Sequence, residues 1–252
     1  MPPMPADPAA IRLLEAAADR AWPPAETLPH DGWLLAATGP GIGRRVNSAA
    51  TLGDGNLSLE DKVAFVEAFY RARGLPAIFK LTPAARPAGL DGFLAQRGYG
   101  EDAPVLVMTR PLEAVPASDA PALPASPSPE WLAANAAVPS HYQAAPEAFR
   151  RLLGRIRLPV GFALLHDEGT VGAIGMAVAD GSRVGLFEVG TIPERRRRGL
   201  GAALVAALLA WGAGHGAGEA YLQVMEANAP ARALYGRLGF EAAYRYWYRV
   251  RR

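Results

Sequence analysis

The segment RRRRGLGAAL, residues 195–204, places four arginines directly before two glycines and an apolar stretch. Adjacent like charges repel and glycine is a poor helix former, so helix formation alone does not explain the segment. The residues before it are typical of a strand and those after it of a helix, whose first N–H groups lack an intrahelical partner and carry partial positive charge. Glycines let a ligand approach the backbone, and arginines donate charge-assisted hydrogen bonds. The segment therefore predicts an anion site, most naturally for a pyrophosphate.

A solvated arginine cluster before an ordinary helix is the alternative interpretation of this segment. The segment is not a Walker A loop, because no Gly-Lys-Ser/Thr occurs, and it is not the dinucleotide motif Gly-x-Gly-x-x-Gly, because residue 204 is Leu. Further along, Asn228 and Tyr235 are two helical turns apart and share one face of the predicted helix. Asn228 suits a helix N-cap, and Tyr235 could be a core residue whose hydroxyl reaches water.

Two motifs in this order resemble the GNAT acetyltransferase superfamily. Its phosphate loop reads Arg/Gln-x-x-Gly-x-Gly/Ala after a strand that often ends Val-x-Pro-Glu, and this chain has TIPE at 191–194 followed by RRRGLG at 196–201. The superfamily's next signature is an Asn, a Tyr seven residues later and then Leu-Gly-Phe, and this chain reads NAPARALYGRLGFE at 228–241. The resemblance covers residues 143–252, whereas residues 1–110 are similar only in the order of their expected elements.

The resemblance implies the acyl-CoA N-acyltransferase fold, an α/β (α+β) architecture with a mixed central sheet flanked by helices. It implies direct transfer of an acetyl group from acetyl-CoA to a primary amine of a small molecule or peptide in a ternary complex. No cysteinyl acyl-enzyme can form, because the chain has no cysteine. Acetyl-CoA would lie where two parallel strands splay apart, with its pyrophosphate on the backbone N–H groups of residues 197–202. The cofactor-binding residues implied by position are Val189, Gly190, Thr191, Arg196, Arg197, Arg198, Gly199, Leu200, Gly201, Ala202 and Asn228.

For catalysis, the same resemblance makes Tyr235 the general acid that protonates or hydrogen-bonds the CoA thiolate. The base is less well defined by the sequence. Several family members use a Glu in the strand before the Asn, but this chain has Gln223 there, and an amide cannot act as a base. Glu188, in the strand that leads to the loop, is our candidate base, with a solvent-facing strand residue as the alternative. Glu226, a water chain or a group from the first half are the other options.

Two other classes of function compete with the enzyme. A non-catalytic CoA sensor or scaffold would keep the loop and lose the chemistry, which Gln223 favours and Tyr235 opposes. Nucleic-acid binding through residues 195–198 would show as salt-dependent DNA retention that survives excess CoA. We expect acetyl-CoA and an amine acceptor as partners, no nucleic acid and no membrane, and a monomer or homodimer.

Composition supports a folded protein of one large or two small domains. The 252 residues are 50% hydrophobic with a formal net charge of +2, which does not argue for nucleic acid. The absence of cysteine fits a reducing compartment, and neither a signal peptide nor an apolar run of about 18 residues occurs, so we expect a cytoplasmic protein. The four histidines are scattered and do not predict a metal site.

The chain is expected to form two related halves. We assign residues 1–110 to a degenerate half, 111–130 to a Pro/Ala-rich linker and 131–252 to the catalytic domain. FLAQRGYG at 93–100 echoes LYGRLGFE at 234–241, which favours duplication over a chance likeness of α/β units. The linker holds six prolines between alanines and serines and is expected to be extended.

The elements that must position these residues follow from caps, periodicity and turns. Asp7 and Pro8 begin a helix that should end near Trp22, and Ser58 with Asp61 caps a helix that stops at Gly74. Further helices are expected at 90–98, 146–154, 200–211 and 229–237. Strands are expected at 32–38, 43–51, 77–82, 103–110, 220–225 and 242–250, with three more between residues 161 and 192 that turn at 167–169 and 180–181.

Overall fold

The computed structural model describes residues 7–113, 120–138 and 145–251. Within them the chain forms ten strands and seven α-helices in a mixed α/β architecture, which confirms the expected fold class. The helices are α1 (Pro8–Ala21), α2 (Leu59–Arg71), α3 (Leu90–Gln96), α4 (Pro129–Ala137), α5 (Pro146–Leu153), α6 (Leu200–Gly214) and α7 (Ala229–Arg237). The strands are β1 (Glu26–His30), β2 (Trp33–Ala37), β3 (Ala49–Ala50), β4 (Ile78–Leu81), β5 (Gly100–Pro111), β6 (Val160–Asp167), β7 (Thr170–Asp180), β8 (Arg183–Thr191), β9 (Glu219–Met225) and β10 (Glu241–Val250).

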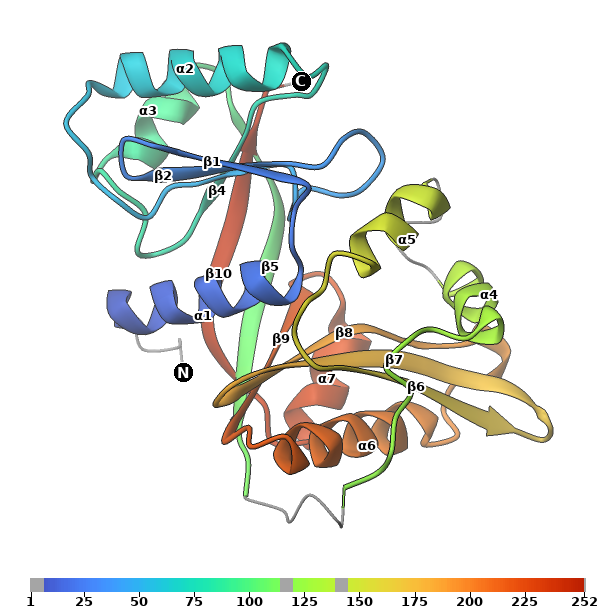
Figure 1. The fold of residues 1–252 in the computed structure, drawn as a ribbon. Coiled ribbons are helices and arrows are strands. Elements are labelled where there is room, and N and C mark those ends of the chain that lie inside the picture. Colours follow the sequence, from blue (N-terminus) through green and yellow to red (C-terminus); the bar gives the residue numbers. More distant parts are fainter. Residues whose placement is uncertain (1–6, 114–119, 139–144, 252) are drawn as a thin grey trace.

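All ten strands join in one sheet, in the order β1-β2-β3-β4-β10-β5-β9-β8-β7-β6. The last strand of each half pairs with the other half, because β5 lies antiparallel to β9 and β10 lies antiparallel to β4. Strands β5 and β10 also pair with each other at the middle of the sheet, and Figure 1 shows both running the length of the molecule. The sheet is thus continuous across the expected boundary, and the division at residues 110 and 131 stays a prediction.

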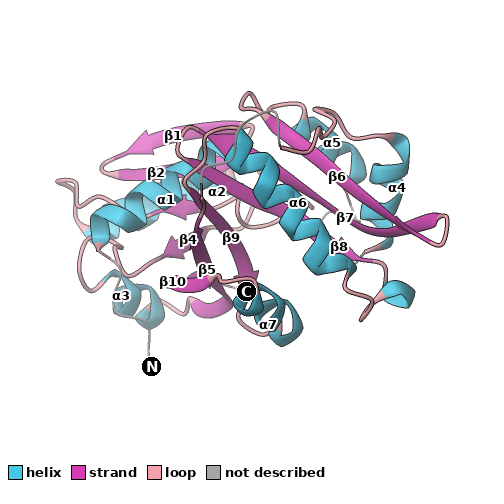
Figure 2. Cartoon of the chain, turned by 90° about the horizontal axis from the view of Figure 1, so that it is seen from below, coloured by secondary structure: helices cyan, strands magenta, loops and turns pink. Residues whose placement is uncertain are grey.

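Helices cover both faces of this sheet. The apolar face of α6, with Leu204, Val205 and Leu208 fully buried, packs on β6, β7 and β8, as the view in Figure 2 shows. The opposite face of those strands is covered by α1, α4 and α5, which share a core cluster with them. On the other side of the molecule, α2 and α3 pack on β2 and β4, and Val63, Val66 and Tyr70 are buried as their spacing predicts.

Helix α1 lies between the two parts of the sheet (Figure 1). Its buried residues Ile11 and Leu14 belong to the same core cluster as Phe187 of β8 and Tyr244 of β10. Because the helix contacts strands of both halves, its apolar face helps to fix their relative position. Asp7 caps its N-terminus through a 3.1 Å hydrogen bond from the N–H of Ala9, as the sequence predicts.

The two halves also end their last helices in the same way. Gly98 after α3 and Gly239 after α7 have φ values of 80° and 81°. The following aromatic residues, Tyr99 and Phe240, each donate a 3.0 Å backbone hydrogen bond to a carbonyl five residues earlier. This left-handed helix ending needs glycine, because other residues pay a steric cost there. It supports the duplication inferred from the sequence.

Three local expectations differ from the structure. The strand expected at 43–51 is confined to β3, because the side chain of Asn47 takes up the backbone groups of a loop over residues 38–48. Helix α4 falls at the start of the expected catalytic half, and its Ser128 cap followed by Pro129 carries the same signal as Asp7 with Pro8. Strand β1, which pairs with β2, was not expected.

Candidate functional site

A cavity of about 870 Å³ opens where the parallel strands β8 and β9 separate. The two strands pair from Arg183 with Glu219 to Leu186 with Leu222. After these residues both strands continue without pairing with each other. On its other side β8 bulges, so that two residues, Glu188 and Val189, oppose the single Gly175 of β7. A bulge re-aims side chains beside a site, and Glu188 adopts a left-handed φ of 49° there.

Most of the residues predicted from the sequence line this cavity. Those that do are Glu188, Val189, Gly190, Thr191, Arg196, Arg197, Gly199, Leu200, Gly201, Ala202, Asn228 and Tyr235. They come from β8, from the loop that leads into α6, and from α7 with its cap. The predicted adjacency of the glycine loop and the Asn-Tyr helix therefore holds in three dimensions.

Arg198 is the exception among the predicted residues. Its guanidinium does not line the cavity but pairs with Asp167 at 2.9 Å and with Glu168 at 3.2 Å, both in the β6–β7 turn. Arg195 pairs with the same two carboxylates. The neighbouring turn therefore offsets the charge of these two side chains, and a role of Arg198 in binding the cofactor stays a prediction.

The start of α6 keeps its backbone open toward the cavity. Gly199 caps the helix with φ 80° and ψ −7°, a left-handed conformation that favours glycine. A Cβ added to Gly199 would meet no atom within 4 Å, so the glycine is required by its backbone conformation and not by crowding. Free N–H groups at a helix start attract anions, and Arg196 and Arg197 add positive charge at the same place.

Glu188 lies half-buried in the cavity wall. Asn135 of α4 donates a 3.0 Å hydrogen bond from Nδ2 to Glu188 Oε2. Burial raises the pKa of Glu188, while the Asn135 hydrogen bond and the positive charge of Arg45 oppose that rise. A carboxyl group with a raised pKa in a cleft has the properties of a general base.

Tyr235 lines the cavity from α7, and its ring packs against Phe240 with centroids 5.8 Å apart. Burial raises the pKa of Tyr235 to about 12, so the hydroxyl holds its proton throughout the neutral range. Asn228 caps α7 by accepting a hydrogen bond of 3.2 Å from the N–H of Ala231. Capping therefore accounts for the Asn228 side chain, which also lines the cavity.

Gln223 lies in the cavity wall, in the strand where the sequence resemblance implies a Glu in several family members. The hydroxyl of Tyr246 donates to Gln223 Oε1 at 2.9 Å, which fixes the side chain. Glu226, the other alternative base, instead pairs with Arg245 at 3.0 Å and does not line the cavity. Of the carboxylates weighed from the sequence, only Glu188 lies in the cavity wall.

Comparison with known proteins agrees with this geometry. Residues 8–249 match the family described as "Probable histone acetyltransferase Rv0428c C-terminal". The chain belongs to this GNAT family. A relative in Bacillus subtilis, the uncharacterized N-acetyltransferase YobR, is 29% identical in an alignment that covers 96% of this chain and 99% of YobR.

Solved structures show the same fold. A GCN5-related N-acetyltransferase from Kribbella flavida aligns with a TM-score of 0.64 at 20% identity, over 96% of this chain and 95% of its own. A tandem GNAT protein from the clavulanic acid biosynthesis pathway aligns with a TM-score of 0.57 at 16% identity, over 98% of this chain and 89% of its own. The GNAT fold thus extends over both halves, and the family uses acetyl-CoA.

In the first half, the segment between β3 and α2 has the same place in the order of elements as the loop between β8 and α6. The parallel pair of that half, β3 with β4, ends at Ala50 and Lys80, and the chain then turns toward α2. The carboxylate of Asp31, which lies between β1 and β2, accepts the N–H groups of two residues in that segment, Asn56 at 2.7 Å and Leu57 at 3.0 Å. These two hydrogen bonds hold the pKa of Asp31 below its usual range. A carboxylate of the protein itself thus accepts backbone N–H groups just before the start of α2.

Two residues at this site were missed by the sequence analysis, namely Arg45 and Asn135. Arg45 lines the cavity and Asn135 holds Glu188. Arg45 lies in a segment that was expected to be a strand, and Asn135 in the helix that was not expected. Tyr244, Tyr246 and Tyr248 alternate along β10 and all three are buried, and Tyr246 and Tyr248 line the cavity.

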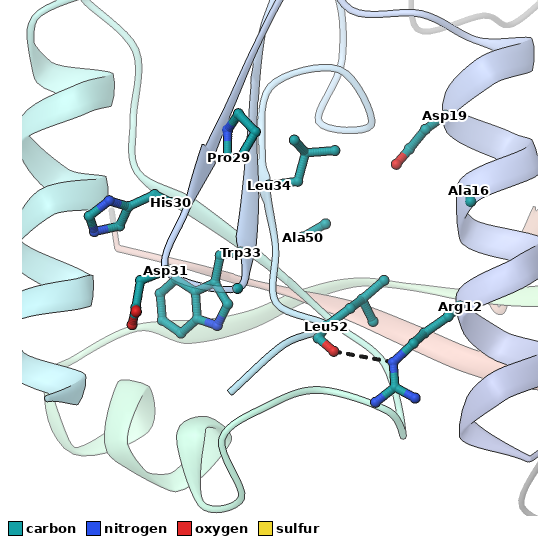
Figure 3. Close-up of a pocket in the computed structure, with 11 residues that line it drawn as sticks. Arg12, Ala16, Asp19, Pro29, His30, Asp31, Trp33, Leu34, Ala50 and Leu52 are labelled. Atoms are coloured by element: carbon teal, nitrogen blue, oxygen red, sulfur yellow. Dashed lines mark hydrogen bonds between the residues drawn. The ribbon is translucent and has the colours of Figure 1, made fainter. Parts of the chain in front are cut away.

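A smaller cavity of about 440 Å³ lies beside α1 in the first half, between Arg12, Asp19 and the β1–β2 turn (Figure 3). None of the predicted site residues lines it. Across the described parts of the chain no cluster of His, Asp or Glu could hold a metal ion. In those same parts no helix is long and apolar enough to cross a membrane. His141 lies outside the described residues.

Proposed function

We propose that this GNAT chain is an acetyl-CoA-dependent N-acetyltransferase that acetylates a primary amine by direct transfer. The observation that carries the proposal is one cavity that holds a glycine-opened helix start, a desolvated carboxylate and a protonated tyrosine. Helix starts bind phosphates, carboxylates accept protons and tyrosines donate hydrogen bonds. Transfer of an acetyl group from acetyl-CoA to an amine requires all three: binding of the CoA phosphates, removal of a proton from the amine, and stabilisation of the departing thiolate.

The cofactor would lie along the separated strands. The backbone N–H groups of residues 197–202 would bind the pyrophosphate of acetyl-CoA, with Arg196 and Arg197 offsetting its charge. The exposed backbone of Val189, Gly190 and Thr191 would pair with the pantetheine arm and hold the thioester carbonyl. Fixed N–H donors near that carbonyl would stabilise the oxyanion that forms when the amine attacks.

Glu188 would act on the acceptor. An ammonium group cannot attack, because its nitrogen has no free electron pair. A carboxylate whose pKa is raised by burial accepts the ammonium proton more readily than an exposed one does. The neutral amine then forms the C–N bond, the C–S bond breaks and the CoA thiolate departs, and the proton that the nitrogen loses on becoming an amide balances the one that the thiolate takes up. A ternary complex gains most of its rate from holding these groups in place.

Tyr235 would act on the leaving group. With its pKa near 12 and a thiol near 8.5, full proton transfer to the thiolate is uphill by about 5 kcal/mol. A hydrogen bond from the hydroxyl to the developing thiolate has no such cost and is worth about 1.5–3 kcal/mol. We therefore assign Tyr235 the stabilisation of the thiolate, with the proton supplied as CoA leaves.

We expect one acetyl-CoA per chain, because a carboxylate already accepts backbone N–H groups before α2 in the first half. Asp31 already accepts the N–H groups that a phosphate would need there, and two anions at one place would repel. We expect calorimetry to give one site per chain, in the second half. Two equivalent sites would overturn this assignment.

An amine-panel assay that follows CoA release tests the proposal. The panel contains amino acids, polyamines, aminoglycosides and lysine-containing peptides, because the family description names histones and a lysine side chain is a primary amine. Turnover above the hydrolysis background with at least one amine supports the enzyme. Tight acetyl-CoA binding with no turnover across the panel would instead support a CoA sensor.

A further inference from the structure

Gln223 and Glu188 reach the cavity from two strands that stop pairing beside it. The last pair of β8 and β9 is Leu186 with Leu222, so Gln223 lies one residue beyond it and Glu188 two residues beyond it. Successive residues of a strand are about 3.3 Å apart, and paired strands are about 4.8 Å apart. One small molecule in the gap can therefore contact both side chains if they point the same way.

Both side chains do lie on one face of the sheet. Leu222 and Val224, on either side of Gln223, pack into the core beneath α6, so the alternation of a strand puts Gln223 on the opposite face. Glu188 accepts its hydrogen bond from Asn135 of α4, and α4 covers that opposite face. An acceptor whose amine reaches Glu188 is thus brought near the amide of Gln223.

Tyr246 of β10 holds this amide in one orientation. Its hydroxyl donates a 2.9 Å hydrogen bond to Gln223 Oε1. Tyr248, two residues further on, is hydrogen-bonded to Tyr246, and burial together with that bond raises the pKa of Tyr248. A hydrogen bond raises the pKa of a tyrosine when the neutral hydroxyl donates it. Tyr248 is therefore the donor to the Tyr246 oxygen, and the Tyr246 proton is directed to Gln223.

A buried ion pair in turn fixes the ring of Tyr246. Lys80 Nζ lies 4.3 Å from the centroid of that ring, and the same ammonium pairs with Glu15 of α1. Glu15 also accepts a 2.6 Å hydrogen bond from the hydroxyl of Tyr244. All four of these side chains are buried, and a buried polar network whose members are paired is rigid. Gln223 is thus presented to the cavity on a rigid support.

The amide nitrogen of Gln223 keeps both of its N–H donors. In the part of the chain that the structure describes, Gln223 Nε2 has no hydrogen-bond partner. These donors suit an oxygen with lone pairs, such as a carbonyl oxygen, and do not suit an ammonium group, which has no lone pair. A polyamine or a lysine side chain has no such oxygen beside its amine.

We propose that Gln223 binds the acceptor by donating from Nε2 to a carbonyl oxygen beside the amine, so that the substrate is a primary amine with an adjacent carbonyl group, as at the N-terminus of a peptide or in an amino acid amide. The inference rests on the proposed function and names the substrate class of the same site. The acceptor's nitrogen lies at Glu188 and its oxygen at Gln223. Tyr246 is a positioning residue that acts through Gln223.

Matched acceptors test this assignment by CoA release. For several side chains, the amino acid amide is compared with the amine that lacks the carbonyl group. Each kcat/KM is divided by the wild-type value for the same acceptor, so the different basicity of the two amines cancels. Gln223→Leu should lower kcat/KM for the amide by about 2- to 10-fold, as the loss of one neutral hydrogen bond predicts, and leave the plain amine nearly unchanged.

Gln223→Glu keeps the shape of the side chain and an oxygen that accepts from Tyr246, and replaces only the two donors. At pH 8, where an ordinary glutamate is ionised, it should lower kcat/KM for the amide at least as much as Gln223→Leu does, because two acceptor oxygens then face each other. A rise for both acceptors in Gln223→Glu would mean that this position serves proton removal, and would overturn the assignment.

Tyr246→Phe should show part of the same selective loss, in KM and not in kcat, because the Gln223 amide is then free to turn. Tyr244→Phe is the matched control on the same strand and should keep the preference, because its hydroxyl bonds to Glu15. Melting curves establish that each variant is folded. An equal loss for both acceptors in Gln223→Leu would overturn the assignment.

Calorimetry with the N-acetylated products of the amide and of the plain amine, in the presence of CoA, gives the same comparison without turnover. The wild type should bind the product of the amide more tightly, and Gln223→Leu should bring the two Kd values together. Equal Kd values in the wild type would overturn the assignment. Absence of turnover with any amine would overturn the proposed function, and product binding would still judge Gln223.

Discussion

Replacing Asn135 by leucine tests whether Glu188 is the base. Asn135 donates a 3.0 Å hydrogen bond to Glu188, which stabilises the carboxylate and partly offsets the rise in its pKa caused by burial. Leucine has a similar volume and no donor. A hydrogen bond to a charged group is worth about 1.5–3 kcal/mol, which at about 1.4 kcal/mol per unit corresponds to a further rise of about 1–2 units in the Glu188 pKa.

The sign of the effect on rate follows from the role of a base. Glu188 must be ionised to accept a proton, so kcat/KM should fall as the pH decreases through its pKa. In Asn135→Leu that fall should begin about 1–2 pH units higher. Glu188→Gln should remove this part of the profile and lower the rate by about 10²- to 10⁴-fold.

The assay is steady-state CoA release over a range of about pH 5 to 9 with one acceptor. Protonation of the free amine also shapes the profile, but it is a property of the substrate and is the same for every variant. Only the part of the pH profile that Glu188 sets should therefore differ between the variants. Superimposable profiles for the wild type and Glu188→Gln would refute the reasoning and return the base to water.

Two further predictions follow from burial. Tyr235→Phe should lower kcat by about 10- to 100-fold and leave the Kd for acetyl-CoA nearly unchanged, because the lost hydrogen bond forms only as the thiolate develops; wild-type turnover would remove Tyr235 from the mechanism. Burial raises the pKa of Asp19 to about 6, so its ionisation above that pH opposes folding, and Asp19→Asn should raise the free energy of unfolding at pH 8 by at most about 3 kcal/mol. That gain should vanish below about pH 4, where Asp19 is protonated in both states; denaturant unfolding at the two pH values measures it, and an equal gain at both would contradict the assignment.

Features that depend on neighbouring residues were predictable from the sequence. The caps of α1 and α2, the turns of β6–β7–β8 and the glycine loop before α6 each lie in one short segment. Their spacing reports directly on backbone hydrogen bonding, because a cap or a turn is completed within a few residues. Helix α4 had such a signal too, but its cap Ser128 and its first residue Pro129 lie in the proline-rich stretch that was interpreted as linker.

Features that depend on distant partners were not predictable in this way. Nothing near β5 states that it pairs with β9 and not with a strand of its own half, because strand pairing is decided by the whole sheet. Arg45 and Asn135 reach the surroundings of Glu188 from separate parts of the chain. The arginine run was only half explained, because the β6–β7 turn that binds Arg195 and Arg198 is near them only in the folded protein.

Calorimetric titration with acetyl-CoA tests the account most directly. A valine at Gly199 would be strained at φ 80° and would place a branched side chain where the pyrophosphate should approach. Gly89 is the matched control, because it caps α3 with φ 85° and ψ −6° and also has open space around it. The account predicts one site per chain in the wild type and in Gly89→Val, and no measurable binding in a folded Gly199→Val. Wild-type affinity in Gly199→Val would contradict the assignment of this loop as the cofactor site.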